Sequence, residues 1–169
     1  DGGMLGLLPV YARDMEMSKE AAAYTITALS LGNVFFQIPI GWIADRTSKR
    51  KTMIACFIVT ALGLAALPFA ITTIWLWSLM LVTGAAGFGI YTVSLSELGD
   101  RFRGADLIAG TSAFPTVWGL GALVGSLVCG LAMDLFGPHG FPGILLAFFI
   151  AFILIQALRS FRQSRRAPV

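Results

Sequence analysis

Five long apolar segments, separated by short polar turns, make up most of the chain. They cover residues 21–44, 52–71, 74–98, 107–136 and 141–158. A helix needs about 20 predominantly apolar residues to cross the hydrocarbon core of a bilayer, and these segments come close to or exceed that length. A shorter apolar stretch, residues 2–11, precedes them and is too short to span. The pattern predicts an all-α protein, a polytopic transmembrane helix bundle in a single domain.

Local signals mark the ends of these segments. Ser18, in the polar connector 12–20, is a suitable N-cap for the first long helix. Pro68 is expected to break the second segment, and Pro39 and Pro115 to bend the first and fourth. The sequence Gly-Pro-His-Gly at 137–140 is a strong turn signal. A basic tail, residues 159–169, closes the chain.

The alternative to a membrane protein is a soluble bundle of unusually apolar helices. Such helices would carry a polar face with a period of 3.6 residues, whereas residues 141–158 are apolar all round. Composition points the same way, because 57% of the residues are hydrophobic and 12% are charged. A soluble domain carries about 25% charged residues. Lipid must therefore be the solvent for much of the surface.

The basic residues are strongly biased to one side of the predicted membrane. Because successive turns alternate sides, one side receives ten basic residues and the other receives only Arg13 and Lys19. The ten are Arg46, Lys49, Arg50, Lys51, Arg101, Arg103, Arg159, Arg162, Arg165 and Arg166. By the positive-inside rule the first side is cytoplasmic, so the C-terminus is expected in the cytoplasm and His139 outside. These short turns lack the basic, aromatic-interleaved stripe of a nucleic-acid binder, so no nucleic-acid partner is expected.

No constellation of an enzyme is visible in the sequence. We find no nucleophile with a base, no phosphate loop and no metal-ligand cluster, so neither a metal nor another cofactor is expected. Cys56 and Cys129 lie inside apolar segments and are interpreted as small packing residues. The chain begins Asp-Gly-Gly without a signal peptide, and we expect it to be a piece of a longer protein.

The turn after the first long segment carries a specific charge pattern. A glycine is followed after three residues by an acid and a base, and after two more by a basic pair. This pattern resembles the loop motif of the major facilitator superfamily, and the matching residues are Gly41, Asp45, Arg46, Lys49 and Arg50. The family often has a second glycine inside the turn, where this chain has Thr47 and Ser48.

The resemblance implies half of a transporter. Members have twelve helices in two six-helix halves, so this chain would be one half that lacks most of its first helix, with the other half as its partner. Residues 6–11 and the basic tail favour the C-terminal half, which implies the N-terminal six-helix half as that partner. The implied mechanism is alternating access for a small solute in the cell membrane, with protons as a candidate coupling ion. A non-transporting membrane sensor or scaffold that kept the fold is the alternative, and a channel would need a polar filter sequence that is not visible.

Asp45 is the residue of the motif with a conformational interpretation. An acid at a helix C-terminus is disfavoured by the helix dipole, so Asp45 needs a compensating partner. A partner in the other half would make it a gate, with Arg46 as the competing local partner, although adjacent helical residues face each other poorly. The alternative is that the basic residues of this turn only anchor topology at the lipid headgroups.

Polar residues within a membrane are costly and tend to face a cavity. The candidate cavity-lining residues are Asn33 and Gln37 in the first long segment, Tyr91 and Glu97 in the third, and Trp118 in the fourth. For Asn33 and Gln37, four residues apart on one face, hydrogen bonding between helices is the alternative. For Glu97 a local ion pair with Arg101 is preferred over a proton-carrying role.

Glycines spaced for close helix packing occur in two segments. Gly121, Gly125 and Gly130 lie in the fourth segment, and Gly84, Gly87 and Gly89 lie in the third. Small residues four apart allow helices to cross closely. We expect generic packing for most of them, with contact between the two halves as the alternative.

Overall fold

The computed structural model describes residues 2–164, with side chains through Gln156. The described residues form six α-helices joined by short turns and contain no strand. The helices are α1 (Gly2–Asp14), α2 (Lys19–Arg46), α3 (Lys49–Ala70), α4 (Leu76–Arg101), α5 (Gly104–Phe136) and α6 (Gly140–Ser164). The all-α fold class predicted from the sequence is confirmed.

Most of the helices extend further than the apolar segments that predicted them. α1 continues to Asp14, past residue 11, and α6 continues to Ser164, past residue 158. Backbone hydrogen bonds do not require apolar side chains, so a helix can continue into the polar flanks of its span. Part of the predicted tail 159–169 is therefore helical, and residues 165–169 lie outside the described part of the chain.

Two expectations about helix ends have clear outcomes. The Ser18 cap is confirmed, because its hydroxyl accepts a hydrogen bond from the Ala21 amide at 3.2 Å. The expected break at Pro68 is wrong. Pro68 lies inside α3, and regular bonding resumes after it, since the Ile71 amide donates to the Leu67 carbonyl at 3.0 Å.

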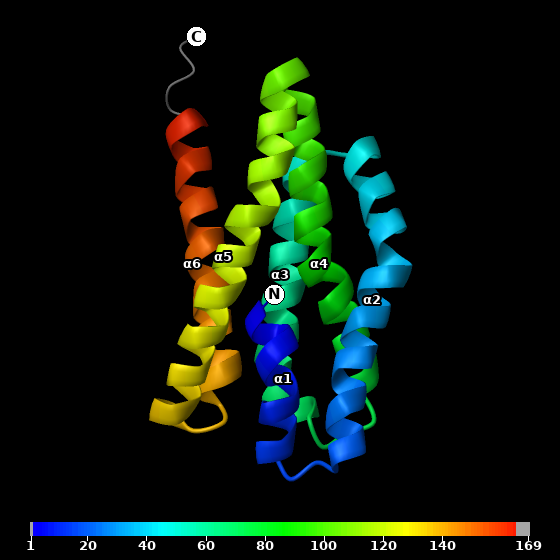
Figure 1. The fold of residues 1–169 in the computed structure, drawn as a ribbon, viewed down its shortest axis with the longest axis vertical. Coiled ribbons are helices and arrows are strands. Elements are labelled where there is room, and N and C mark those ends of the chain that lie inside the picture. The colour runs from blue at the N-terminus through cyan, green and yellow to red at the C-terminus, as the bar shows by residue number, and fades with distance from the viewer. Residues whose placement is uncertain (1, 165–169) are drawn as a thin grey trace.

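The helices run alternately along the long axis of the molecule (Figure 1). The α2–α3 turn, the α4–α5 turn and the end of α6 lie together at one end, and the three other turns lie at the opposite end. α2, α3, α4 and α5 are long and apolar enough to cross a membrane, whereas the described apolar part of α6 is Gly140–Gln156. The alternation places the basic turns at one end of the bundle.

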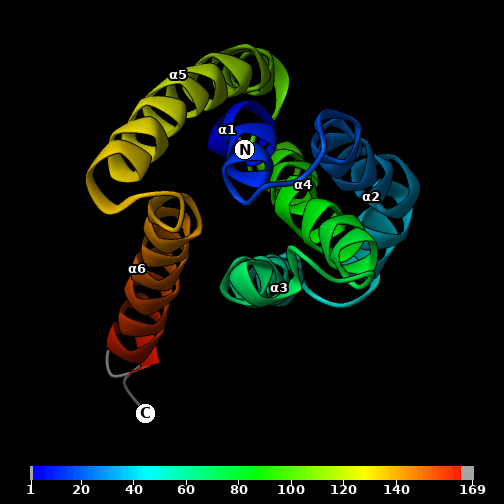
Figure 2. The same cartoon turned by 90° about the horizontal axis from the view of Figure 1, so that it is seen from below.

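α4 occupies the centre of the bundle, with α2 and α3 packed along it (Figure 2). Two glycines bring α2 and α4 into backbone contact. A Cβ on Gly32 would collide with the Leu81 carbonyl, and one on Gly84 would collide with the Leu29 carbonyl. Close approach of this kind is the usual role of small residues between membrane helices.

α1 is short but firmly embedded. Leu8 and Tyr11 are almost completely buried, and the Tyr11 ring packs against Phe141 of α6 with ring centroids 5.5 Å apart. The Tyr11 hydroxyl lies 3.5 Å from Nδ1 of the exposed His139, which fixes α1 to the α5–α6 turn. Cys129, a free buried cysteine, contributes to the same core.

α5 differs from the other long helices in its exposure. It is bowed (Figure 2), it contains Pro115, and only Cys129 and Ala132 are buried among its residues. A Cβ on Gly121, Gly125 or Gly130 would meet nothing within 4 Å. Among the described residues, these three glycines therefore face no neighbouring helix, and the close contact between α1 and α5 is made by Gly2 and Gly3 of α1.

Candidate functional site

Lys49 ties the α2–α3 turn to the end of α4. Its ammonium lies 2.5 Å from the Asp100 carboxylate and 3.7 Å from the Asp45 carboxylate, and it donates to the Ser96 carbonyl at 3.1 Å. The Ser96 hydroxyl in turn donates to Asp45 at 3.5 Å. Lys49 is 17% exposed, so one largely covered cation is shared by two acids at the C-terminal ends of two helices. We call Asp45, Lys49, Ser96 and Asp100 the ionic latch.

The latch identifies the local partner of Asp45. The sequence named Arg46 as the competing local partner, and this is wrong, because Lys49, the first residue of α3, takes that place across the α2–α3 turn. The Arg46 guanidinium lies instead over the Trp42 ring, 4.1 Å from its centroid. Trp42 and Arg46 are four apart on α2 and therefore face each other, whereas the adjacent Asp45 and Arg46 do not. The Asp45 side chain remains 65% exposed, which leaves room for a second partner.

The remaining motif residues are placed apart from the latch. Gly41 faces α4, where a Cβ would lie 3.9 Å from the Thr92 methyl group. Arg50 lines a pocket of about 500 Å³ at the same end of the bundle, together with Glu97 and Arg101. The motif therefore has two parts: Asp45 and Lys49 belong to the latch against α4, and Arg50 lines the separate pocket beside Glu97.

Asn33 and Gln37 lie on one flank of α2, and both are partly buried. The Asn33 side-chain oxygen is buried and, among the residues that the structure describes, has no hydrogen-bond partner. A buried polar atom without a partner is unfavourable and is usually satisfied by water or a ligand. Asn33 therefore presents an unused acceptor in the middle of a spanning helix.

Tyr91 and Trp118 are brought together by α4 and α5. Their ring centroids are 4.6 Å apart with an edge-to-face geometry, and Phe114 completes the cluster 5.1 Å from Tyr91. Trp118, Phe114 and Gly121 line an open groove of about 330 Å³ on α5. Two candidates of the sequence thus form one aromatic surface.

Glu97 does not join this aromatic cluster. It forms an ion pair with Arg101 at 2.5 Å, as the sequence predicted, and lines the pocket that Arg50 also lines. The pair is local, between residues four apart on α4, and Glu97 is 27% exposed. Its carboxylate therefore already has a cation beside it.

The sequence analysis missed several residues that the structure places at these sites. Asp100 was not singled out, yet it carries the same signal as Asp45, an acid at a helix C-terminus. Phe114 and Ser96 gave no signal of their own, because their roles depend on which helices are neighbours. Among the described residues, no group of three metal-ligating side chains lies together.

The apolar helix bundle and the charged α2–α3 turn are features of membrane transport proteins of one family. A comparison with known protein families identifies that family. The chain matches the Major Facilitator Superfamily over residues 1–169, so it belongs to that family and is a multi-pass membrane protein.

Curated relatives carry the same family label. The chain is 26% identical to the uncharacterized MFS-type transporter YfkF of Bacillus subtilis over 136 residues, which are 78% of this chain and 34% of YfkF. It is 26% identical to the uncharacterized MFS-type transporter YE1530 of Yersinia enterocolitica over 138 residues, 82% of this chain and 35% of that protein. The chain thus spans about a third of the length of these relatives. No solved structure matches it.

Proposed function

We propose that this chain is the C-terminal half of a secondary active transporter that moves a small solute across the membrane by alternating access. Its partner would be an N-terminal six-helix half, and the end that carries the ionic latch would face the cytoplasm. Family membership supports transport in general. The relatives, described as transporters, are about three times as long as the matched region, which agrees with a second half.

The observation that carries the proposal is the unpartnered oxygen of Asn33. It lies on the same flank of α2 as Gln37, and both residues are partly accessible. Amide side chains can both donate and accept hydrogen bonds, so the pair would recognise a polar group of a solute. The edges of Tyr91 and Trp118 would supply an apolar wall for the same pathway. The sites of alternating-access transporters lie near the bilayer midplane, where such residues are otherwise costly.

The test is transport by the full-length protein in membrane vesicles. A panel of solutes is assayed with and without a proton gradient, first for the natural sequence. Asn33→Ala and Gln37→Ala should then reduce uptake or efflux several-fold while the amount of inserted protein stays normal. Thr27→Ala is the matched control, because Thr27 is an exposed polar residue of the same helix.

Three results would change the interpretation. Normal transport by both amide variants would make Asn33 and Gln37 packing residues and place the solute site elsewhere. Equal transport with and without the gradient would remove protons as the coupling ion. No transport of any solute by the well-folded natural protein would favour a sensor or scaffold that kept the fold.

A further inference from the structure

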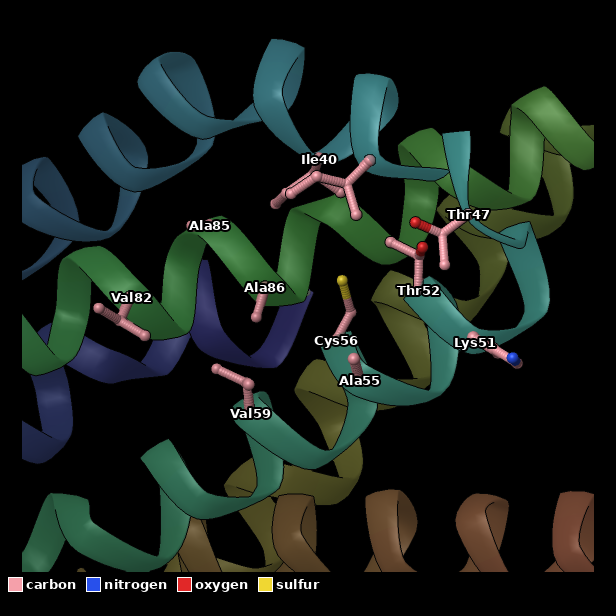
Figure 3. A pocket seen from close by; sticks show the side chains of 11 residues that line it. Ile40, Thr47, Lys51, Thr52, Ala55, Cys56, Val59, Val82, Ala85 and Ala86 are labelled. Carbon is pink, nitrogen blue, oxygen red and sulfur yellow. The ribbon is translucent and has the colours of Figure 1, made fainter. Parts of the chain in front are cut away.

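A long apolar groove lies between α2 and α3, with α4 as its floor (Figure 3). It has a volume of about 410 Å³ and is lined along most of its length by alkyl side chains and the Cys56 thiol. Between Thr52 and Val59 it follows α3 for roughly 10 Å. α2 and α3 pack along α4 and contact each other much less, and the groove lies between them.

One end of the groove is polar. Thr47 and Thr52 lie at that end, with Lys51 beyond them, and Val82 and Ala85 lie toward the other end (Figure 3). Thr52 is only 8% exposed, and among the described residues its hydroxyl has no hydrogen-bond partner. A buried hydroxyl without a partner is unfavourable, so this end of the groove holds an unfilled polar position.

The same end is also electropositive. Lys51 is exposed, and in the described part of the chain no carboxylate lies within ion-pair distance of it. Lys49, two residues earlier, is already occupied by Asp45 and Asp100. α3 begins here with no acidic residue in its first turn and no capping hydrogen bond from the Ser48 side chain, so the positive end of its dipole adds to the charge of Lys51.

The polar end lies at the depth of lipid headgroups. Trp42 is exposed near the end of α2, and the Arg46 guanidinium lies over its ring. Tryptophan and basic residues are enriched where a membrane helix meets the interface with water. The apolar part of the groove therefore extends from the headgroup region into the hydrocarbon core.

We propose that this groove binds one acyl chain of an anionic phospholipid. The chain would lie between α2 and α3, and the phosphate would accept hydrogen bonds from Lys51 and Thr52 at the amino-terminal end of α3. Basic residues at the interface attract anionic headgroups, and the bilayer itself supplies the phospholipid at this depth. The assignment to the cytoplasmic leaflet rests on the orientation given in the proposed function, whereas the binding itself does not depend on transport.

The test uses the full-length protein in nanodiscs and a phosphatidylglycerol that carries a diazirine in one acyl chain. After illumination, mass spectrometry should locate the label on the peptides that contain Val59, Val82 and Ala86. Ala55→Trp places a large ring in the groove and should reduce this labelling several-fold. Ala65→Trp is the matched control, because Ala65 is also an exposed alanine of α3 and does not line the groove.

The headgroup is tested with a phosphatidylcholine that carries the same diazirine chain. Phosphatidylglycerol should label the natural protein more strongly, and Lys51→Gln should reduce that advantage by about fivefold, as expected for loss of one lysine at the membrane surface. Equal labelling of Ala55→Trp and Ala65→Trp would overturn the proposal. Equal labelling by the two lipids would overturn the assignment of an anionic headgroup. The free fatty acid that carries the same diazirine is tested in parallel, and stronger labelling by it would overturn the assignment of a phospholipid.

Discussion

Gly32 and Gly84 set how closely α2 and α4 approach each other. At both positions a Cβ would collide with a backbone carbonyl of the facing helix, Leu81 for Gly32 and Leu29 for Gly84. Backbone atoms cannot move aside as a flexible side chain can, so any side chain at these positions would separate the helices. The contact is therefore sensitive to a single methyl group.

Gly84→Ala in the full-length protein should lower its stability by about 1–3 kcal/mol, the usual cost of overpacking a well-packed core. The measurement is the thermal unfolding midpoint in detergent. Gly99→Ala is the control on the same helix, because a Cβ there meets nothing within 4 Å. If both variants unfold at the same temperature as the natural protein, α2 and α4 are not held by this contact.

The contrast between glycines could not be predicted from the sequence. Spacing on one helix defines which residues share a face, and it identified Gly84 and Gly121 with equal weight. Whether a glycine meets another helix depends on the neighbour: in the described part of the chain Gly84 faces the Leu29 backbone, whereas a Cβ on Gly121 would meet nothing within 4 Å. Gly32 was not singled out at all, because a glycine without a second glycine at helical spacing gives no such packing signal.

At the scale of elements, the ionic latch joins α2, α3 and α4 at one end of the bundle. Lys49 is the only member with a positive charge, and it contacts Asp45, Asp100 and the Ser96 carbonyl. Removing the cation would leave two carboxylates near each other without their shared counter-charge and would remove the hydrogen bond to the Ser96 carbonyl. Of the polar contacts within the latch, the weak Ser96–Asp45 hydrogen bond would then remain between α2 and α4.

Lys49→Met should therefore loosen this turn and cost about 1 kcal/mol, near the upper limit for a pair with exposed partners. Spin labels at Ser48 and Arg103 of the full-length protein would report a broader distance distribution in the variant. Lys49→Arg should restore the narrow distribution, and Lys19→Met, at the other end of α2, should leave it unchanged. A distribution that stays narrow in Lys49→Met would show that packing alone holds the turn.

The sequence was more informative about elements than about their partners. Apolar segments predicted the number and order of the long helices, because a bilayer demands continuous apolar length and internal backbone hydrogen bonding. The predicted end of the last helix was too early, since α6 continues past residue 158 into the charged residues that follow, as far as Ser164. Of the candidate site, the Glu97–Arg101 pair was predictable from helical spacing, whereas the contact of Tyr91 with Trp118 required knowing that α4 and α5 are neighbours.

At the scale of the whole molecule, the alternation of the helices defines two ends, and the basic turns share one of them. The positive-inside rule assigns that end to the cytoplasm. In the full-length protein without other reactive cysteines, Ser48→Cys should react with a membrane-impermeant thiol reagent only from the cytoplasmic side. His139→Cys should react only from outside, and labelling of both positions from the same side would contradict the topology.

On the proposed function, Asp45 would connect the latch to the conformational cycle of the whole transporter. Its side chain is 65% exposed even though Lys49 and Ser96 contact it, which leaves room for a second partner from the proposed N-terminal half. We expect that partner to be a helix N-terminus or a basic side chain, in contact only when the cytoplasmic side is closed. The contact would offset the repulsion of roughly 0.3–1 kcal/mol that an acid experiences at its own helix C-terminus.

Asp45→Asn should therefore shift the full-length protein toward the inward-open state by about 1–3 kcal/mol, enough to change a two-state population several-fold or more. The measurement is the labelling rate of a cysteine placed in the cavity near the cytoplasmic opening. Asp100→Asn is the matched control, because it also removes a carboxylate from Lys49 but leaves Asp45 in place. A faster rate in Asp45→Asn than in Asp100→Asn is expected, since only the first variant loses the contact between halves. Equal rates in the two variants would assign the whole effect to the latch within this half, and an unchanged rate in folded Asp45→Asn would leave Asp45 without a gating role.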